Sequence, residues 1–491
     1  MKRILCLALV LLMLLPMAIA CKKDEEPTGT GNSDVAGNNQ EEASTDLLAT
    51  IPSANYGGKD FIISMQRGSE VIAEELTGET GNDTIYQWLQ KINSIYGVNV
   101  KGQIPTGDFW QAQSNEASSG NVKTALYGHN AYDIYRAVNA GLYKNWNSMG
   151  EMIDLSAERW DQIVNGGLTW NGVLYGLTGD LGYSKLQGAM ATYCNVELLD
   201  EIGYTTDDLY KMVEDKEWTF DFFQSIVKDY YIDTDYDGKK SAGDTYGFVS
   251  TSGNAHDIWL EQFGIAITKV NEVTDKIEPT LSTLENVDVI DMVWSFLHEN
   301  QGVYSAQGWA ASYTVIGPED AFFSDRRAVM ITTRLSYAKQ FSEDLGTDAF
   351  GILPAPLLNE DQDDYYTKLF DGYTIWGVSK NILDSDVDFI AHITDALCAE
   401  SSQTVYPKFY DILLKQRYSK DPATAKMVDI VMKNVNIDAT FMFSSLLSNY
   451  PRIARNLLSV NTAPDLKGAY DGIAGALVTG LETLYSLHTP E

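Results

Sequence analysis

The chain has 491 residues, of which 44% are hydrophobic, and its 68 acidic against 35 basic residues give a formal net charge of −33. Such an excess of negative charge excludes nucleic acid and other polyanions as partners, because they would be repelled. The length exceeds what one hydrophobic core usually serves, so we expect two lobes.

The first twenty residues predict an export signal. Lys2 and Arg3 supply positive charge, and the uncharged apolar run 4–17 is shorter than the roughly 20 residues that a membrane-spanning helix needs. The run ends in Ala18-Ile-Ala-Cys21, which looks like a bacterial lipobox. We therefore expect cleavage of residues 1–20, lipidation of Cys21, and a lipid-anchored protein at the extracellular face of the cell membrane. The alternative is ordinary cleavage beside an incidental cysteine.

Residues 21–53 predict a flexible tether. The stretch KKDEEPTGTGNSDVAGNNQEEASTD after Cys21 has almost no large apolar residues, so it cannot bury enough surface to offset the entropy of ordering. The folded module is expected over 54–491, with lobe 1 near 57–180 plus a later return segment, and lobe 2 near 190–350 plus part of the C-terminal helices. Cys194 and Cys398 are the cysteines of this module. We expect buried thiols there, with a disulfide bond between them as the alternative.

Strands and helices alternate along the module. Residues 59–65 predict a strand, Asp83 is expected to cap a helix whose apolar stripe ends before Gly97, and 98–100 begin the next strand. Further strands are expected at 132–135, 192–195, 328–332 and 374–378, separated by helices such as 287–298. From Phe389 onward the chain reads as almost entirely helical. This order predicts an α/β fold with two parallel-sheet lobes, crossing strands between them, and a cleft at the strand ends.

Several segments resemble one known family when they are taken in order. They are 132–135 with 140–143, 170–176, 192–195 with 198–199 and 202–203, 217–222 with Thr219 as N-cap, 244–248, 322–330, 351–354 and 372–381. Together they are similar to the extracellular solute-binding proteins of carbohydrate ABC importers, the maltodextrin-binding-like cluster, over roughly 57–481. Cys194 stands where that family usually has an aromatic residue.

The resemblance implies a periplasmic-binding-protein-like fold that captures a sugar for ABC permease subunits, as a monomer and without catalysis. A neutral oligosaccharide is favoured because the net charge of −33 would repel anionic sugars at long range. Two alternatives are a lipid-anchored hydrolase of cell-surface glycans and a sensory or adhesion lipoprotein on the same fold. The sequence has no H-E-x-x-H, G-x-S-x-G or P-loop motif and its five histidines are scattered, so we expect no required cofactor.

An acidic loop at 233–244 predicts a structural calcium site. Its aspartates occupy positions 1, 3, 5 and 12 of a twelve-residue EF-hand-like loop, with Gly238 at position 6. Residues 246–249 read as a strand and not as the exit helix of an EF-hand. Aspartate at position 12 is shorter than the usual glutamate, and a solvated acidic turn is the alternative. The expected ligands are Asp233, Asp235, Asp237, the carbonyl of Lys239, Ser241 and Asp244.

A sugar site needs flat aromatic rings for the C–H face and polar side chains for the hydroxyl groups. Most aromatic residues of the chain are expected in the core, so positions at strand ends and crossings are the candidates for contact. These are Arg67, Asp180, Tyr183, Trp309, Arg334, Asp371 and Tyr373.

Overall fold

The structure is a computed structural model that describes residues 46–490, except 69, 252–253, 272, 275, 282, 307–318 and 411–421. Cys21 therefore lies outside the described residues, as does Trp309. The side chains of Leu48 and Ile51 are buried, so the folded body begins ahead of the predicted boundary at residue 54. Within the described part of the chain, no helix is long and apolar enough to cross a membrane.

A four-stranded sheet has the order β13-β3-β1-β2. Its strands are β1 (Lys59–Met65), β2 (Val98–Gln103), β3 (Thr124–Asn130) and β13 (Thr374–Gly377), of which β1, β2 and β3 are parallel and β13 runs antiparallel to β3. Helix α1 (Thr80–Tyr96) connects β1 to β2 and ends at Gly97, whose φ is 58°. The predicted strand-helix-strand unit is thus confirmed.

The start of α1 differs from the prediction. The side chain of Glu79 caps the helix by accepting a hydrogen bond from the backbone N–H of Asn82. Asp83 lies in the first turn, and its carboxylate accepts from the backbone N–H groups of Thr77 and Gly78. The prediction that Asp83 caps the helix is wrong because its carboxylate binds the preceding loop instead.

The predicted strand at 132–135 is also wrong. These residues lie in a short 3-10 helix, Ala131–Asp133, and the start of α3 (Ile134–Asn139), whereas β3 precedes them. All seven residues of β3 are buried, so it lacks the alternating polar face that marks a half-exposed strand. Gly128 belongs there because a Cβ would lie 2.5 Å from Met65 Sδ and 2.6 Å from the Trp376 ring.

A six-stranded sheet has the order β11-β4-β10-β6-β5, with β9 also paired to β6. The β10–β6 and β6–β9 pairs are parallel, while β4 is antiparallel to β10 and β11, and β5 is antiparallel to β6. The strands are β4 (Met190–Asn195), β5 (Tyr231–Ile232), β6 (Thr245–Thr251), β9 (Val303–Ala306), β10 (Ala328–Arg334) and β11 (Phe350–Leu353). The α/β class is confirmed, with antiparallel pairs added to the expected parallel ones.

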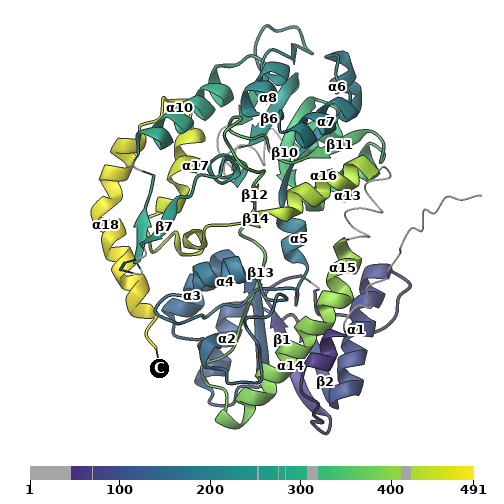
Figure 1. Cartoon of the computed structure of the whole chain (residues 1–491), viewed down its shortest axis with the longest axis vertical. Helices are drawn as coiled ribbons and strands as arrows, with labels where there is room; N and C mark the ends of the chain where they lie inside the picture. The colour runs from purple at the N-terminus through teal and green to yellow at the C-terminus, as the bar shows by residue number, and fades with distance from the viewer. Residues whose placement is uncertain are drawn as a thin grey trace, which may run out of the picture. The chain divides into compact units, whose positions relative to one another are not determined.

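Two smaller sheets and the remaining helices complete the described chain (Figure 1). The smaller sheets are β7 (Thr268–Asn271) with β8 (Lys276–Pro279) and β12 (Thr367–Lys368) with β14 (Val435–Asn436). The helices are α2 (Phe109–Ser118), α4 (Gln162–Leu168), α5 (Ser184–Gly188), α6 (Val196–Glu201), α7 (Thr206–Asp215), α8 (Phe220–Val227), α9 (Ile258–Gln262), α10 (Leu284–Glu299), α12 (Glu319–Ser324), α13 (Ala338–Asp344), α14 (Asp384–Gln403), α15 (Val405–Phe409), α16 (Pro422–Lys433), α17 (Ile453–Leu458) and α18 (Leu466–Leu487). Further 3-10 helices are Leu47–Thr50, Trp146–Ser148, Asn254–His256, Leu335–Tyr337, Ala439–Phe443 and Tyr450–Arg452.

Several expectations about these helices are confirmed. Thr219 caps α8 by accepting a hydrogen bond from the backbone N–H of Phe222 at 3.4 Å. The predicted helix at 287–298 lies within α10. From α14 onward the described chain is largely helical, with β14 as a short exception.

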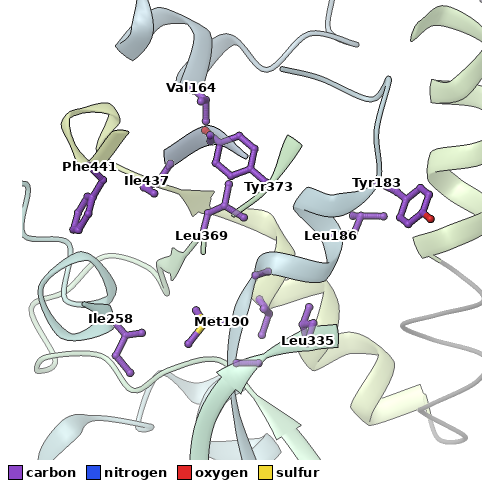
Figure 2. Close-up of a cluster of buried hydrophobic side chains, with 14 of the residues drawn as sticks. Val164, Tyr183, Leu186, Met190, Ile258, Leu335, Leu369, Tyr373, Ile437 and Phe441 are labelled. Carbon is purple, nitrogen blue, oxygen red and sulfur yellow. The ribbon is translucent and has the colours of Figure 1, made fainter. Parts of the chain in front are cut away.

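Two crossing segments, 184–190 and 366–374, run between the four-stranded and the six-stranded sheet. They are bonded to each other, because the Phe370 N–H donates to the Gly188 carbonyl at 3.0 Å and Ala189 forms an antiparallel bridge with Leu369. Figure 2 shows Met190 and Leu369 among the buried apolar side chains around these segments. These hydrogen bonds and apolar contacts hold the two crossing segments against each other.

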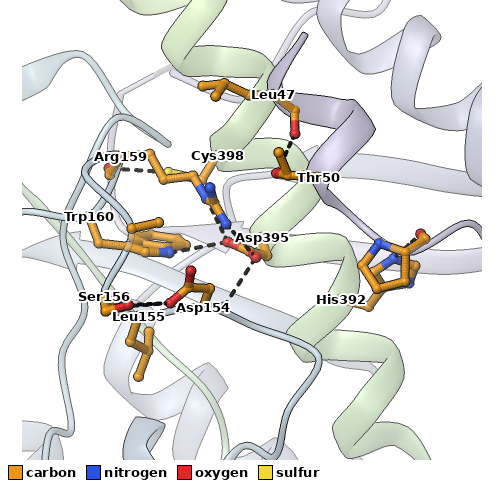
Figure 3. A network of polar contacts seen from close by, with 12 residues as sticks. Leu47, Thr50, Asp154, Leu155, Ser156, Arg159, Trp160, His392, Asp395 and Cys398 are labelled. Carbon is orange, nitrogen blue, oxygen red and sulfur yellow. Dashed lines mark hydrogen bonds and ion pairs between the residues drawn. The ribbon is translucent and has the colours of Figure 1, made fainter. Parts of the chain in front are cut away.

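A buried ion pair secures α14 to the loop before α4 (Figure 3). The Arg159 guanidinium donates from Nε and Nη2 to the Asp395 carboxylate at 2.8 and 2.7 Å, and Trp160 Nε1 donates to the same carboxylate at 3.2 Å. Cys398 lies on this helix and Cys194 lies in β4, and both thiols are buried and free. The structure thus agrees with two buried thiols and not with a disulfide bond.

Candidate functional site

A cavity of about 430 Å³ lies where strand ends of the two large sheets meet. Its lining comes from the ends of β1, β3 and β10, from α5, and from the residues that lead into β13. The lining residues are Arg67, Gly68, Glu70, Asn130, Tyr183, Ser184, Gln187, Gly188, Arg334, Ser336, Phe370, Gly372, Tyr373 and Thr374.

The topology explains why these residues meet. β1 and β3 are parallel, so their carboxyl ends lie at one edge of the sheet, and β13 enters at that edge because it runs antiparallel to β3. Ligands of open α/β sheets bind at such carboxyl edges. The crossing segments then bring α5 and residues 370–374 to the same place, where β10 ends at Arg334.

Four of the predicted contact residues line this cavity together. Arg67 donates from Nε to Asn130 Oδ1 at 2.7 Å, and Arg334 donates from Nη2 to Tyr337 Oη at 3.1 Å. The Tyr183 ring stacks on Phe409 with 3.7 Å between centroids. Tyr373 is only 1% exposed, so its ring serves the core more than the cavity, as Figure 2 shows.

Two other predicted contact residues, Asp180 and Asp371, do not appear in the described lining. The Asp180 carboxylate accepts a hydrogen bond from Ser402 Oγ of α14 at 2.9 Å, and burial raises its pKa to about 6. Asp371 is 7% exposed and its carboxylate lies 3.5 Å from the guanidinium of Arg452, while its chain neighbours line the cavity. Trp309 lies outside the described residues.

Glu70 is a lining residue that the sequence reasoning missed. It is 5% exposed, and its carboxylate accepts hydrogen bonds from the Ser184 backbone N–H at 2.6 Å and from Thr374 Oγ1. Burial raises the pKa of this carboxyl group. Glu70 therefore ties the start of α5 to the start of β13 and shapes the cavity wall.

The sequence held little signal for the missed residues. Glu70 lies in an irregular loop after β1, where periodicity gives no information. Asn130 ends β3, and the sequence gives no signal for it because its pattern predicts the strand at 132–135 instead.

The acidic loop lies apart from this cavity, between β5 and β6, which pair as antiparallel strands. Ligand atoms of Asp233, Asp235 and Asp237 all lie within 4.8 Å of one another. Gly238 has a φ of 74°, a conformation that glycine adopts without strain. As predicted, a strand, β6, follows the loop. Three of the expected ligands are thus brought together.

The other expected calcium ligands accept hydrogen bonds in or beside the loop, among them Ser241 Oγ, which accepts from the backbone N–H of Gly243 at 3.1 Å. The buried Asp244 carboxylate accepts from the backbone N–H groups of Thr234 at 3.0 Å and Ser241 at 2.7 Å. The Lys239 carbonyl accepts from Tyr231 Oη at 3.2 Å. Asp244 therefore closes the loop. The three converging carboxylates of Asp233, Asp235 and Asp237 each accept one backbone hydrogen bond as well, from Gly238, Asp237 and Lys239.

No family model matches the chain, and no curated protein matches it. Solved structures do share its fold. A cyclo/maltodextrin-binding protein complexed with maltotetraose is 14% identical with a TM-score of 0.53, over 87% of this chain and 98% of that chain. The maltose-binding periplasmic protein MalE of Listeria monocytogenes, in complex with maltose, is 16% identical with a TM-score of 0.50, over 87% of this chain and 97% of that chain.

Both similarities span almost the whole length of the solved chains. Identities this low show a common fold and leave the ligand open. The chain thus has the two-lobed, periplasmic-binding-protein-like fold that the sequence predicted.

Proposed function

We propose that this chain captures a sugar for an ABC importer. The observation that carries the proposal is that polar side chains from both large sheets line one cavity at the ends of the strands. A solute that contacts both sets of residues stabilises the arrangement in which they face each other, which is how a binding protein couples occupancy to closure. The fold shared with maltose- and maltodextrin-binding proteins supports a sugar as the solute.

The lining also favours binding over hydrolysis. Glycoside hydrolysis ordinarily needs two carboxylates that flank the scissile bond. Among the described lining residues Glu70 is the one acid, and both of its oxygen atoms already accept hydrogen bonds. This arrangement supports a binding protein over the glycan hydrolase.

A ligand screen tests the proposal. A sugar that fits should raise the free energy of unfolding by about 2.7 kcal/mol at a hundredfold excess over its dissociation constant, which thermal melting detects. No product should form when the same sugars are incubated with the protein. Melting shifts with amino acids, peptides or polyamines alone would contradict a sugar ligand, and product release that is lost in Glu70→Gln would favour the hydrolase.

The proposal includes a place for the protein in the cell. Lipid on Cys21 and the polar tether behind it would hold the body at the outer face of the membrane, within reach of permease subunits. A monomer suffices for this role, because the described cavity is lined by one chain.

Calcium binding at 233–244 is a second proposed property. The convergence of three carboxylates within 4.8 Å and the left-handed Gly238 at position 6 support it. Calcium would there neutralise three neighbouring negative charges and stabilise the turn between β5 and β6.

A further inference from the structure

Two arginines line the cavity from opposite sheets. Arg67 follows β1 of the four-stranded sheet, and Arg334 ends β10 of the six-stranded sheet. They are the cationic residues of the described lining. A guanidinium group is permanently charged and its fork of N–H donors matches the oxygen atoms of a carboxylate, sulfate or phosphate.

Neither guanidinium forms an ion pair with a carboxylate among the described residues. Arg67 bonds to the neutral amide of Asn130, and Arg334 bonds to the hydroxyl of Tyr337. Asp320 lies close enough for Arg334 to lower its pKa, although burial raises that pKa overall, and the two groups do not form a salt bridge. The positive charges at the cavity are thus not cancelled by direct contact.

The acid of the lining does not balance these charges either. Both oxygens of Glu70 accept hydrogen bonds from α5 and β13, as described above. Its buried side chain serves the wall of the cavity, and it forms no ion pair with Arg67 or Arg334. An incoming anion would therefore meet two arginines whose N–H groups are only partly used by the protein.

The aromatic rings of the lining are already engaged. Phe370 lies beneath the Arg334 guanidinium at 4.7 Å, and Tyr183 stacks on Phe409 at 3.7 Å. The stacking on Phe370 holds the guanidinium in one orientation, so less side-chain entropy is lost when it binds a ligand. The lining therefore suits an anionic group better than the apolar face of a neutral sugar.

We propose that the captured sugar is acidic, and that Arg67 and Arg334 bind its anionic oxygen group. This inference rests on the proposed capture of a sugar and names its class. It departs from the neutral oligosaccharide expected from the whole-chain charge, because salt screens exposed charges beyond about 8 Å at physiological ionic strength. The charges inside the cavity therefore have more influence on which sugar binds than the net charge of −33.

Calorimetry on the full chain tests the proposal with four kinds of sugar. They are uronic acid oligosaccharides, the same oligosaccharides with each carboxylate reduced to an alcohol, sulfated sugars and phosphorylated sugars. Arg67→Gln and Arg334→Gln remove each charge but keep an amide donor. Arg326→Gln is the matched control, because Arg326 is exposed and pairs with Glu197 outside the cavity.

At least one acidic sugar should bind, and the best of them should bind the wild-type protein at least about tenfold more tightly than its uncharged counterpart. Each cavity variant should weaken that binding by about tenfold and reduce its salt dependence, while Arg326→Gln leaves both unchanged. The best of the three acidic classes identifies the anionic group.

The outcomes separate this inference from the proposed function. Binding of uncharged sugars alone, or acidic-sugar binding that survives both cavity substitutions, overturns the inference and leaves sugar capture standing. Failure of every sugar, with a protein that melts cooperatively and binds another class of solute, overturns sugar capture and the inference with it.

Discussion

The guanidinium carbon of Arg334 lies 4.7 Å from the centre of the Phe370 ring, and the two residues come from different parts of the fold. Arg334 ends a strand of the six-stranded sheet, whereas Phe370 belongs to a crossing segment. A cation over an aromatic face contributes about 0.5–1 kcal/mol when exposed and more when it is desolvated. The orientation of Arg334 in the cavity thus depends on the crossing segment.

Phe370→Leu should weaken capture of the solute without unfolding the protein. Leucine keeps an apolar side chain but removes the ring face, so Arg334 gains rotational freedom, and the dissociation constant should rise about two- to fivefold. Calorimetry measures the change. Phe370→Tyr keeps the ring and should bind like the wild type, and an equal loss in both variants would contradict an orienting role for the ring.

Asp180 should make stability depend on pH. Its pKa in the folded protein is raised from 3.8 to about 6 by burial, so the folded state binds the proton more tightly than the unfolded chain. The protonated carboxyl group therefore stabilises the fold below pH 3.8, and this contribution is lost as the pH rises through about 6.

Asp180→Asn removes this titration. The free energy of unfolding of the wild type minus that of the variant should fall as the pH rises from about 4 to about 7, which chemical denaturation at several pH values measures. A difference that stays flat or rises over this range would contradict the raised pKa.

Calcium at millimolar concentration should raise the melting temperature of the wild type relative to EDTA. Asp235→Ala should abolish that increase, because it removes one of the three converging carboxylates. Asp361→Ala, which changes an exposed aspartate outside the loop, should keep the full response. If wild type and Asp235→Ala melt alike with calcium and with EDTA, the loop is only a turn.

Asp395→Asn should destabilise the body strongly. The substitution leaves the buried Arg159 guanidinium without its charged partner, and such a loss costs about 3–5 kcal/mol. Urea denaturation measures the change. A loss below about 1 kcal/mol would mean that Arg159 finds another partner or water.

Cys21→Ser should release the protein from membranes. The variant lacks the thiol that would carry lipid, and an apolar run of this kind does not by itself anchor a mature protein once it is cleaved. Fractionation followed by detection of the protein in membrane and soluble fractions measures the change. Retention of Cys21→Ser in the membrane fraction would point to an anchor other than lipid.

The sequence predicted the regular helices and strands well where their apolar residues are periodic, because that periodicity indicates the type of secondary structure. β1 has the predicted bounds, and α1 ends at Gly97 and buries its predicted stripe except for Ile95, which is 48% exposed. β3 was not predicted because it is buried on both sides and therefore shows no alternation, and because Thr124 is its one β-branched residue. Local hydrogen bonds in the loop before α1 also decided which acid caps that helix.

The cavity was predictable only in part. Arg67 and Arg334 were found because they follow strands, and strand ends of an open sheet converge. Asp180 and Asp371 also occupy such positions, but their carboxylates bond to Ser402 and lie beside Arg452, respectively. The choice between facing a cavity and facing a neighbouring element depends on tertiary contacts that one sequence does not reveal.

The two crossing segments have a consequence for how the proposed binding protein would release a solute. Residues 184–188 and 370–374 belong to the connections between the sheets, and they also supply half of the residues that line the cavity. Any rotation of one sheet against the other would therefore move cavity-lining residues directly, because these residues belong to the connections between the sheets. Changes that adapt the cavity to a new solute would act on the same residues that govern opening, so affinity and release rate are expected to evolve together.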